Sequence, residues 1–230
     1  GRLVQAGDKL MAQFLKGDGE AYCQRRDSIV KEKIFRDMIS YSRTVPLVVQ
    51  LLTPQIHLHT SSLIYKRPGQ PSNERDWHRD IGIQQDLGHI GLPRVGVKIC
   101  YCLTDFHESE SGMTLFARAS HKCQQALQIP PGACDPIEKV DPILNAGDAI
   151  LFENRTFHTA ASNLSDRISK VLINGYSYRW MRPDINLDLL DTAAPWLRDL
   201  SEIDKQLLGA DGYHDLLKPA EALLEWAGFH

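Results

Sequence analysis

A histidine and an aspartate two residues apart, His78 and Asp80, constrain the fold of this chain more than any other feature. Side chains two positions apart on an extended segment project from the same face, so both groups can hold one ion. A third ligand must come from elsewhere, and His158 is the best candidate because it follows a strand-like run at 149–152. The fold must therefore bring together two segments that are distant in the sequence.

Two imidazoles and one carboxylate on one side of a metal leave the opposite positions open, an arrangement that suits non-haem Fe(II) oxygenases. We therefore predict that His78, Asp80 and His158 bind iron and form the catalytic centre. A His-x-Asp pair alone is a weak signal. The triplet His78-Arg79-Asp80 also occurs in protein-kinase catalytic loops, but that loop needs an asparagine where Gln85 stands, a glycine-rich loop and an Asp-Phe-Gly motif. The sequence lacks all three, which excludes a kinase.

An arginine nine positions after His158, Arg167, strengthens the metal prediction, and Ser169 follows it two residues later. A guanidinium group can pair with a carboxylate through two parallel hydrogen bonds, and a neighbouring hydroxyl can add another. A dicarboxylate co-substrate could be held in this way at its far end while its oxo-acid end chelates iron. The alternative is that Arg167 is a surface turn residue beside Asp166.

Composition limits the remaining possibilities. The chain has 230 residues, of which 43% are apolar and 24% charged, enough for one sizeable core. Its net charge of -3 and the lack of a basic patch argue against nucleic acid as a partner, and no apolar run approaches the roughly 20 residues needed to cross a membrane. Five scattered cysteines without a Cys-x-x-Cys pair predict reduced thiols and a cytoplasmic location. The start reads like the middle of a helix without a signal peptide, so we expect the natural protein to extend further.

The spacing of apolar residues predicts secondary structure, with helices over 3–16 and 28–52 and strands over 56–65, 94–103 and 171–173. A loop rich in proline, glycine and serine at 67–76 leads to the metal motif. We interpret His57 and His59 as sheet residues, and the alternative is that one of them lines a pocket.

Several short motifs follow one another in a fixed order: Leu63-Ile64-Tyr65-Lys66-Arg67-Pro68-Gly69, Trp77-His78-Arg79-Asp80, Leu103-Thr104-Asp105, Gly112, Ser120-His121-Lys122, Gly147-Asp148, Phe157-His158 and Asn163-Leu164-Ser165-Asp166-Arg167. In order and spacing, the stretch from about 45 to 183 resembles the phytanoyl-CoA dioxygenase family of Fe(II)/2-oxoglutarate-dependent oxygenases. The resemblance implies an all-β core with flanking helices, a double-stranded β-helix (jelly-roll, cupin-like barrel). We expect a single domain over 1–230, with helical support at 1–54, the jelly-roll core at 55–182 and a helical tail at 183–230.

The resemblance also implies an activity, the oxidation of an unactivated C–H bond with O2. Hydroxylation is the expected outcome, and desaturation, cyclisation and endoperoxidation stay open. 2-Oxoglutarate would be decarboxylated to succinate and CO2. The expected substrate is a small metabolite or natural-product intermediate, free or linked to CoA or a carrier, and the enzyme would be a monomer or homodimer. The alternative from another class is a non-catalytic cupin-like metal-binding protein.

Family positions suggest which residues contact 2-oxoglutarate. Arg167 and Ser169 would hold its far carboxylate, and Tyr101 and Thr60 would lie beside it. The alternative for Tyr101 and Thr60 is a packing role alone. One departure concerns the arginine, which in several family members lies eleven positions after the distal histidine, where this chain has Ser169. Ala160 also stands where the family tends to have a serine. Another oxo acid, or none, is therefore an open alternative.

Overall fold

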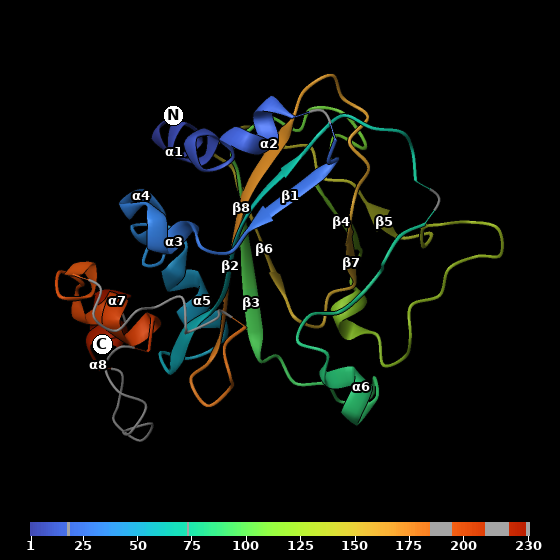
Figure 1. Ribbon diagram of the computed structural model, residues 1–230. Coiled ribbons are helices and arrows are strands. Elements are labelled where there is room, and N and C mark those ends of the chain that lie inside the picture. Colours follow the sequence, from blue (N-terminus) through green and yellow to red (C-terminus); the bar gives the residue numbers. More distant parts are fainter. Residues whose placement is uncertain (18, 73, 185–194, 210–220, 229–230) are drawn as a thin grey trace.

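The strands of the chain form two antiparallel sheets that face each other (Figure 1). The computed structural model describes residues 1–17, 19–72, 74–184, 195–209 and 221–228. The larger sheet has the strand order β1-β2-β8-β3-β6, and the smaller sheet has the order β5-β4-β7. The strand bounds are β1 Tyr22–Arg25, β2 Ile56–Lys66, β3 Gly96–Cys102, β4 Thr114–Ala117, β5 Lys139–Val140, β6 Ala149–Glu153, β7 His158–Ala160 and β8 Ser169–Tyr178.

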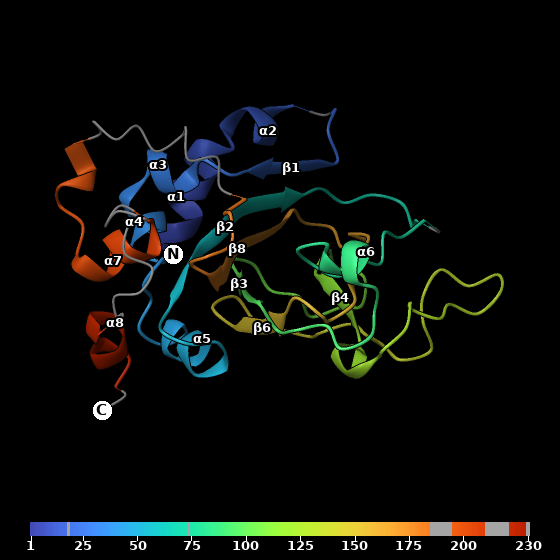
Figure 2. The same ribbon diagram turned by 90° about the horizontal axis from the view of Figure 1, so that it is seen from below.

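The helices are short and pack mainly on one side of the larger sheet, as both ribbon views show (Figures 1 and 2). The helix bounds are α1 Arg2–Leu10, α2 Ala12–Lys16, α3 Ser28–Lys31, α4 Lys33–Arg36, α5 Val45–Leu51, α6 Ile83–Leu87, α7 Glu202–Leu207 and α8 Glu221–Trp226, with 3-10 turns at Ser120–Lys122 and Pro195–Leu197. Phe35 and Val48 of this helical layer are fully buried. The Tyr176 hydroxyl on β8 donates to the Ile39 carbonyl at 2.7 Å, which ties the layer to the sheet.

Alternation along β2 gives the larger sheet two different faces. Leu63 and Tyr65 are buried in the core beneath the helices, whereas Ser62 and Ile64 line a pocket between the sheets. A β-bulge interrupts the register with β8 between Leu58 and Thr60. The inserted residue is His59, so that two consecutive residues, His59 and Thr60, border the same pocket.

A second, smaller core fills one side of the space between the sheets. Its buried members come from β3, β4, β6, β8 and the loop between β3 and β4, and they are Cys100, Cys102, Phe106, Met113, Phe116, Phe152 and Val171. All five cysteines of the chain are free thiols, as predicted. The other side of the interior, beneath β1, β2 and β8, stays open and forms the pocket described below.

The two ends of the chain differ in part from the predicted division into a helical segment at 1–54 and a helical tail at 183–230. The segment 1–54 contains the strand β1, which pairs with β2 and places Tyr22 opposite Lys66. Four residues are too short to give a periodic signal, which is why the sequence suggested helices alone. The predicted tail over 183–230 contains α7 and α8, and its residues 185–194, 210–220 and 229–230 lie outside the described part. None of the described helices is long and apolar enough to span a membrane.

Candidate metal centre

His78 and His158 lie opposite each other on neighbouring antiparallel segments. The backbone N–H of each residue donates to the carbonyl oxygen of the other at 3.0 Å. β7 pairs with β4 on its other edge, so the segment around His78 takes the place of a further strand in the smaller sheet. Directly opposed residues project from the same face. The two imidazole centroids are accordingly 4.4 Å apart.

Both imidazole rings are oriented through Nδ1. Nδ1 of His78 donates to the carbonyl oxygen of Asp76 at 2.8 Å, and Nδ1 of His158 donates to that of Thr156 at 3.0 Å. A carbonyl oxygen can only accept, so each ring carries its proton on Nδ1. The lone pair of each Nε2 is then free for a metal ion.

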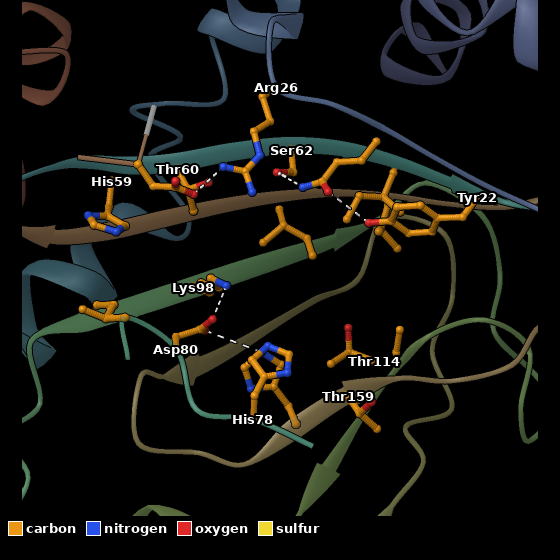
Figure 3. Close-up of a pocket in the computed structure, with 18 of the residues that line it drawn as sticks. Tyr22, Arg26, His59, Thr60, Ser62, His78, Asp80, Lys98, Thr114 and Thr159 are labelled. Atoms are coloured by element: carbon orange, nitrogen blue, oxygen red, sulfur yellow. Dashed lines mark hydrogen bonds and ion pairs between the residues drawn. The ribbon is translucent and has the colours of Figure 1, made fainter. Parts of the chain in front are cut away.

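Asp80 provides a third donor beside the two rings (Figure 3). Its Oδ2 lies 3.6 Å from Nε2 of His158 and is buried without a hydrogen bond to any described residue. Its Oδ1 accepts from Nζ of Lys98 at 2.5 Å. Burying a carboxylate oxygen without a hydrogen-bond partner costs free energy unless the oxygen binds an ion. One ligand atom each from His78, Asp80 and His158 lie within 4.8 Å of one another, so these three residues, called the triad below, fit a single metal ion.

The electrostatics of the triad suit a divalent cation. Burial lowers the pKa of His158 to about 4, so its imidazole is neutral at physiological pH. Burial opposes the ionisation of Asp80, but the ammonium group of Lys98 favours it, and the pKa of the carboxyl group is lowered. Neutral imidazoles and an ionised carboxylate are the protonation states that metal binding requires.

Arg79, between two members of the triad, points to the opposite side and anchors the motif. Its buried guanidinium group donates to the carbonyl oxygens of Arg155 at 2.8 Å, Ser120 at 3.0 Å and Cys123 at 2.7 Å. It also lies 4.3 Å from the centroid of the Phe157 ring. Arg79 therefore fixes the motif to the backbone that leads into β7.

A strained turn follows Asp80. Ile81 has a φ of 69°, a conformation that β-branched residues rarely adopt, and Gly82 has a φ of 72°. The N–H of Asp80 donates to the Asn154 carbonyl at 3.0 Å. The Ile81 side chain fits against Gly96, where an added Cβ would lie 2.6 Å from Ile81 Cδ1. Such strain persists only where the surroundings fix the backbone, and here it holds the carboxylate against the two histidines.

A pocket of about 1100 Å³ opens between the sheets and contains the triad. Figure 3 shows Thr60 and Ser62 on one wall and Thr114 and Thr159 on the opposite wall. Apolar side chains of β2 and β8 lie on the same wall as Thr60 and Ser62. The lining is therefore mixed, as in a site that binds a polar small molecule with an apolar middle.

Two of the predicted co-substrate residues lie at this pocket. Thr60 and Ser169 are both buried in its lining. Ser169 opens β8 and packs against Gly112, whose φ of 92° and missing side chain leave room for it. Of the two histidines on β2, His59 also lines the pocket, whereas Nε2 of the buried His57 lies 2.9 Å from the Ser177 hydroxyl.

The structure corrects the expectation for Arg167. A bend at 165–167 precedes β8, and the Arg167 side chain is exposed and outside the pocket lining. Its guanidinium group lies 3.4 Å from the carbonyl oxygen of Asp105. The bend interrupts the strand alternation that would have placed Arg167 on the same face as Ser169. The alternative of a surface turn residue describes its position.

The structure also corrects the expectation for Tyr101. Lys98 of β3 faces the pocket, and Tyr101, three residues later, faces the helices on the other side of the sheet. Its hydroxyl lies 2.7 Å from Oγ1 of Thr44, and its ring packs edge-to-face on Tyr41. Burial raises the pKa of Tyr101 to about 12. This tyrosine therefore belongs to the core and cannot touch a ligand of the triad.

Two lysines that line the pocket, Lys66 and Lys98, were not predicted from the sequence. Lys98 interrupts an otherwise apolar strand, which is a signal for a buried functional charge. Lys66 has the same strand parity as Thr60, Ser62 and Ile64, all of which line the pocket. Its position on the face of Thr60 was the signal that could have identified it.

Comparison with known proteins places these observations in a family. The family model described as phytanoyl-CoA dioxygenase (PhyH) matches residues 2–171. Dioxygenase af480 of Aspergillus fumigatus is 30% identical over 173 residues, which cover 72% of this chain and 54% of that protein. Dioxygenase trt7 of Aspergillus terreus is 25% identical over 150 residues, covering 64% and 51%. The chain thus spans about half the length of these curated relatives.

Solved structures resemble this chain in fold. HygX from Streptomyces hygroscopicus with nickel and 2-oxoglutarate bound superposes with a TM-score of 0.60 at 14% identity, covering 79% of each chain. The non-haem α-ketoglutarate-dependent epimerase SnoN from nogalamycin biosynthesis gives a TM-score of 0.57 at 19% identity, covering 84% of this chain and 79% of that one. The carbocyclase SnoK from the same biosynthesis gives 0.54 at 18%, covering 84% and 81%. The predicted cupin-like double-stranded β-helix with flanking helices is thereby confirmed.

Proposed function

Because the chain belongs to the phytanoyl-CoA dioxygenase family, we propose that it is an Fe(II)- and 2-oxoglutarate-dependent dioxygenase that oxidises an unactivated C–H bond of a small molecule. One observation carries this proposal. The buried Oδ2 of Asp80, without a protein partner among the described residues, faces Nε2 of His158, while both histidine Nδ1 atoms are engaged by backbone carbonyls. This arrangement leaves three converging donor atoms for one metal ion.

Each member of the proposed site has a distinct role. His78, Asp80 and His158 would hold Fe(II), and bound Fe(II) with 2-oxoglutarate supplies the O2-dependent oxidation while 2-oxoglutarate is converted to succinate and CO2. Lys98 orients Asp80 by binding the oxygen that points away from His158. The Phe152 ring, 4.8 Å from that of His158 between centroids, covers the inner side of the imidazole and excludes water there.

The pocket supports a small-molecule substrate. It is large enough for both an oxo acid and a substrate, and Arg26, His59 and Asp184 add polar groups to its lining. HygX has been solved with hygromycin B bound, and the neighbours SnoN and SnoK are an epimerase and a carbocyclase. One fold thus accommodates several outcomes. We propose hydroxylation for this chain, with desaturation, cyclisation and endoperoxidation as the alternatives.

The metal and co-substrate are tested without knowledge of the substrate. Addition of 2-oxoglutarate to the protein with Fe(II) under anaerobic conditions should produce a weak visible charge-transfer band. Asp80→Ala should bind Fe(II) at least tenfold more weakly, because the triad loses its only anionic donor. A protein that binds iron and shows no band at saturating 2-oxoglutarate would instead be a metal-binding protein of the same fold.

The reaction is tested by product mass. The enzyme is incubated with Fe(II), 2-oxoglutarate, O2 and a panel of natural-product intermediates, and the products are analysed by mass spectrometry. Hydroxylation adds one oxygen atom, whereas desaturation and ring closure remove two hydrogen atoms. Succinate formation that depends on one panel member would identify the substrate. A product that has lost two hydrogens would replace hydroxylation with one of the alternatives.

A further inference from the structure

The pocket lining includes the ammonium group of Lys66, beside Ser169. Lys66 ends β2, and its Cα is paired with that of Ser169 at the start of β8. Both side chains line the pocket that contains the triad. Nζ of Lys66 donates to the backbone carbonyl of Ala161, three residues after His158. Three residues of extended chain span on the order of 10 Å, so a small ligand can reach from His158 to this ammonium group.

We propose that Lys66, assisted by the hydroxyl of Ser169, binds the far carboxylate of the 2-oxo dicarboxylic acid whose other end reaches the triad. The proposal rests on the proposed function, since it assigns one end of the same co-substrate. It gives the role expected of Arg167 to a residue on the neighbouring strand. Lys66 lies directly across the strand pair from Ser169, so the ammonium group and the hydroxyl can contact the same carboxylate.

Of the basic side chains in the pocket, Lys66 is the one best placed to bind an anion. Four basic side chains line it: Arg26, Lys66, Lys98 and Arg182. Arg26 is paired with Asp184 at 2.5 Å, and Lys98 is paired with Asp80 at 2.5 Å. Arg182 is exposed and follows the other end of β8. Among the described residues, Lys66 has a backbone carbonyl as its hydrogen-bond partner and makes no ion pair, so its charge remains available for an anion.

The environment of Lys66 favours an anionic ligand. Burial lowers the pKa of its ammonium group, and nearby Arg75 lowers it further, while Glu110 raises it. A cation that is partly desolvated gains more from a carboxylate than an exposed one does. Lys66 therefore meets a carboxylate in a setting where the ion pair is stronger than on the surface.

An apolar strip on β2 and β8 adjoins Lys66 and Ser169 in the pocket. The residues that follow Lys66 and Ser169 on the same face of the sheet are Ile64 and Val171, which are paired with each other, and then Ile173. Methylene groups pack on such a surface, whereas a further charged group would be excluded from it. The sequence of a polar end, an apolar middle and a metal site matches an acid with a chelating oxo-carboxylate, two methylenes and a terminal carboxylate.

The test compares two oxo acids that differ only at the far end. 2-Oxopentanoate has the same five carbons as 2-oxoglutarate, but a methyl group replaces the terminal carboxylate. Dissociation constants of both acids are measured from the charge-transfer band of the anaerobic Fe(II) protein. Lys66→Met should raise the dissociation constant of 2-oxoglutarate at least tenfold, the loss expected for a charge-assisted hydrogen bond. The dissociation constant of 2-oxopentanoate should change less than twofold. The second acid thus also reports whether the variant is folded.

Two further variants make the test specific. Lys66→Arg keeps the charge and should keep 2-oxoglutarate binding within about tenfold, whereas Arg167→Met, which removes an exposed charge outside the pocket, should leave both acids unchanged. If Lys66→Met weakens the binding of both acids, or of neither, the role of Lys66 is overturned. A selective loss in Arg167→Met would return the carboxylate site to Arg167. Absence of a band in the iron-loaded wild type with 2-oxoglutarate would overturn the proposed function itself, and the inference with it.

Discussion

Lys98 and Asp80 form an ion pair whose two members are unequally exposed to water. The Asp80 side chain is 10% exposed and that of Lys98 is 26% exposed. Removing one partner of such a pair strands the other, and the cost is larger when the buried partner is the one left behind. The charge balance at the triad therefore depends on Lys98 whenever the metal is absent.

We predict that Lys98→Met lowers the free energy of unfolding of the metal-free protein by about 2 to 3 kcal/mol, because the Asp80 carboxylate keeps its burial and loses its counter-charge. The double variant Asp80→Asn, Lys98→Met should recover much of this loss, since no buried charge remains. Urea unfolding in the presence of a chelator measures both. Equal losses in the single and the double variant would mean that Lys98 contributes by packing and not by charge.

Gly112 illustrates a requirement for space beside Ser169. Its φ is 92°, and an added Cβ would collide with the Ser169 side chain and lie 3.1 Å from Cβ of Asn163. Gly132 has a similar φ of 77° with no atom within 4 Å of an added Cβ, so it is a matched control for backbone strain alone. Gly112→Ala should destabilise the protein by at least about 1 kcal/mol more than Gly132→Ala. Equal destabilisation of Gly112→Ala and Gly132→Ala in urea would show that the residues around Ser169 shift at little cost to make room for the added methyl group.

At the scale of elements, helices on the outer face of the larger sheet support the site without touching it. α5 presents Val48, fully buried, to the core and leaves Leu47 42% exposed. β2 and β8 face this layer on one side and the pocket on the other, so the helices and the pocket share the same two strands. Packing in this layer therefore sets how firmly Lys66 and Ser169 are held opposite each other.

We predict that Val48→Ala lowers the free energy of unfolding by about 2 kcal/mol, through lost burial and the cavity that remains. Leu47→Ala removes more carbon from the same helix and should cost less than about 0.5 kcal/mol, because this side chain is already partly in water. Urea unfolding of the two variants gives the comparison. The reverse order would place the contact surface of α5 on the other side of the helix.

The stability of the whole molecule should depend on pH through its buried histidines. Burial lowers the pKa of His57 to about 4, and His59 and Arg179 contribute in the same direction. The unfolded chain, with a histidine pKa near 6.5, then binds more protons than the folded one between pH 6.5 and pH 4. Stability contributed by the neutral imidazole is therefore complete above pH 6.5, falls as the pH decreases towards 4 and changes no further below.

We predict a loss of up to about 1.4 kcal/mol per pH unit for each such histidine across this window. His57→Gln should flatten the dependence, and His158, whose pKa is also lowered to about 4, should account for part of what remains. His107→Gln, at an exposed position, is the control and should leave the slope unchanged. Urea unfolding from pH 7 to pH 4 in metal-free buffer measures the three slopes. An unchanged slope in His57→Gln would mean that this histidine is charged in the folded state.

By itself, the sequence identified the local features of this protein. Strand runs, the His-x-Asp pair of His78 and Asp80, the distal His158 and the family motifs all depend on neighbouring residues, and the structure brings these three side chains together. The short strand β1 was not predicted, because four residues are too few to show a periodic pattern of apolar side chains.

Only the tertiary structure decided which residues share a face and which strands are paired. Apart from Lys98, β3 is apolar on both faces, so its sequence shows no regular alternation that would place Tyr101 on the face of the helices. A bend turned Arg167 outwards, and the register of β2 with β8 placed Lys66 opposite Ser169. Strand register is set by contacts between residues far apart in the chain, and a shift of one residue reverses every side chain. For that reason the candidate metal ligands could be predicted from short motifs, whereas the groups that surround them depended on the fold.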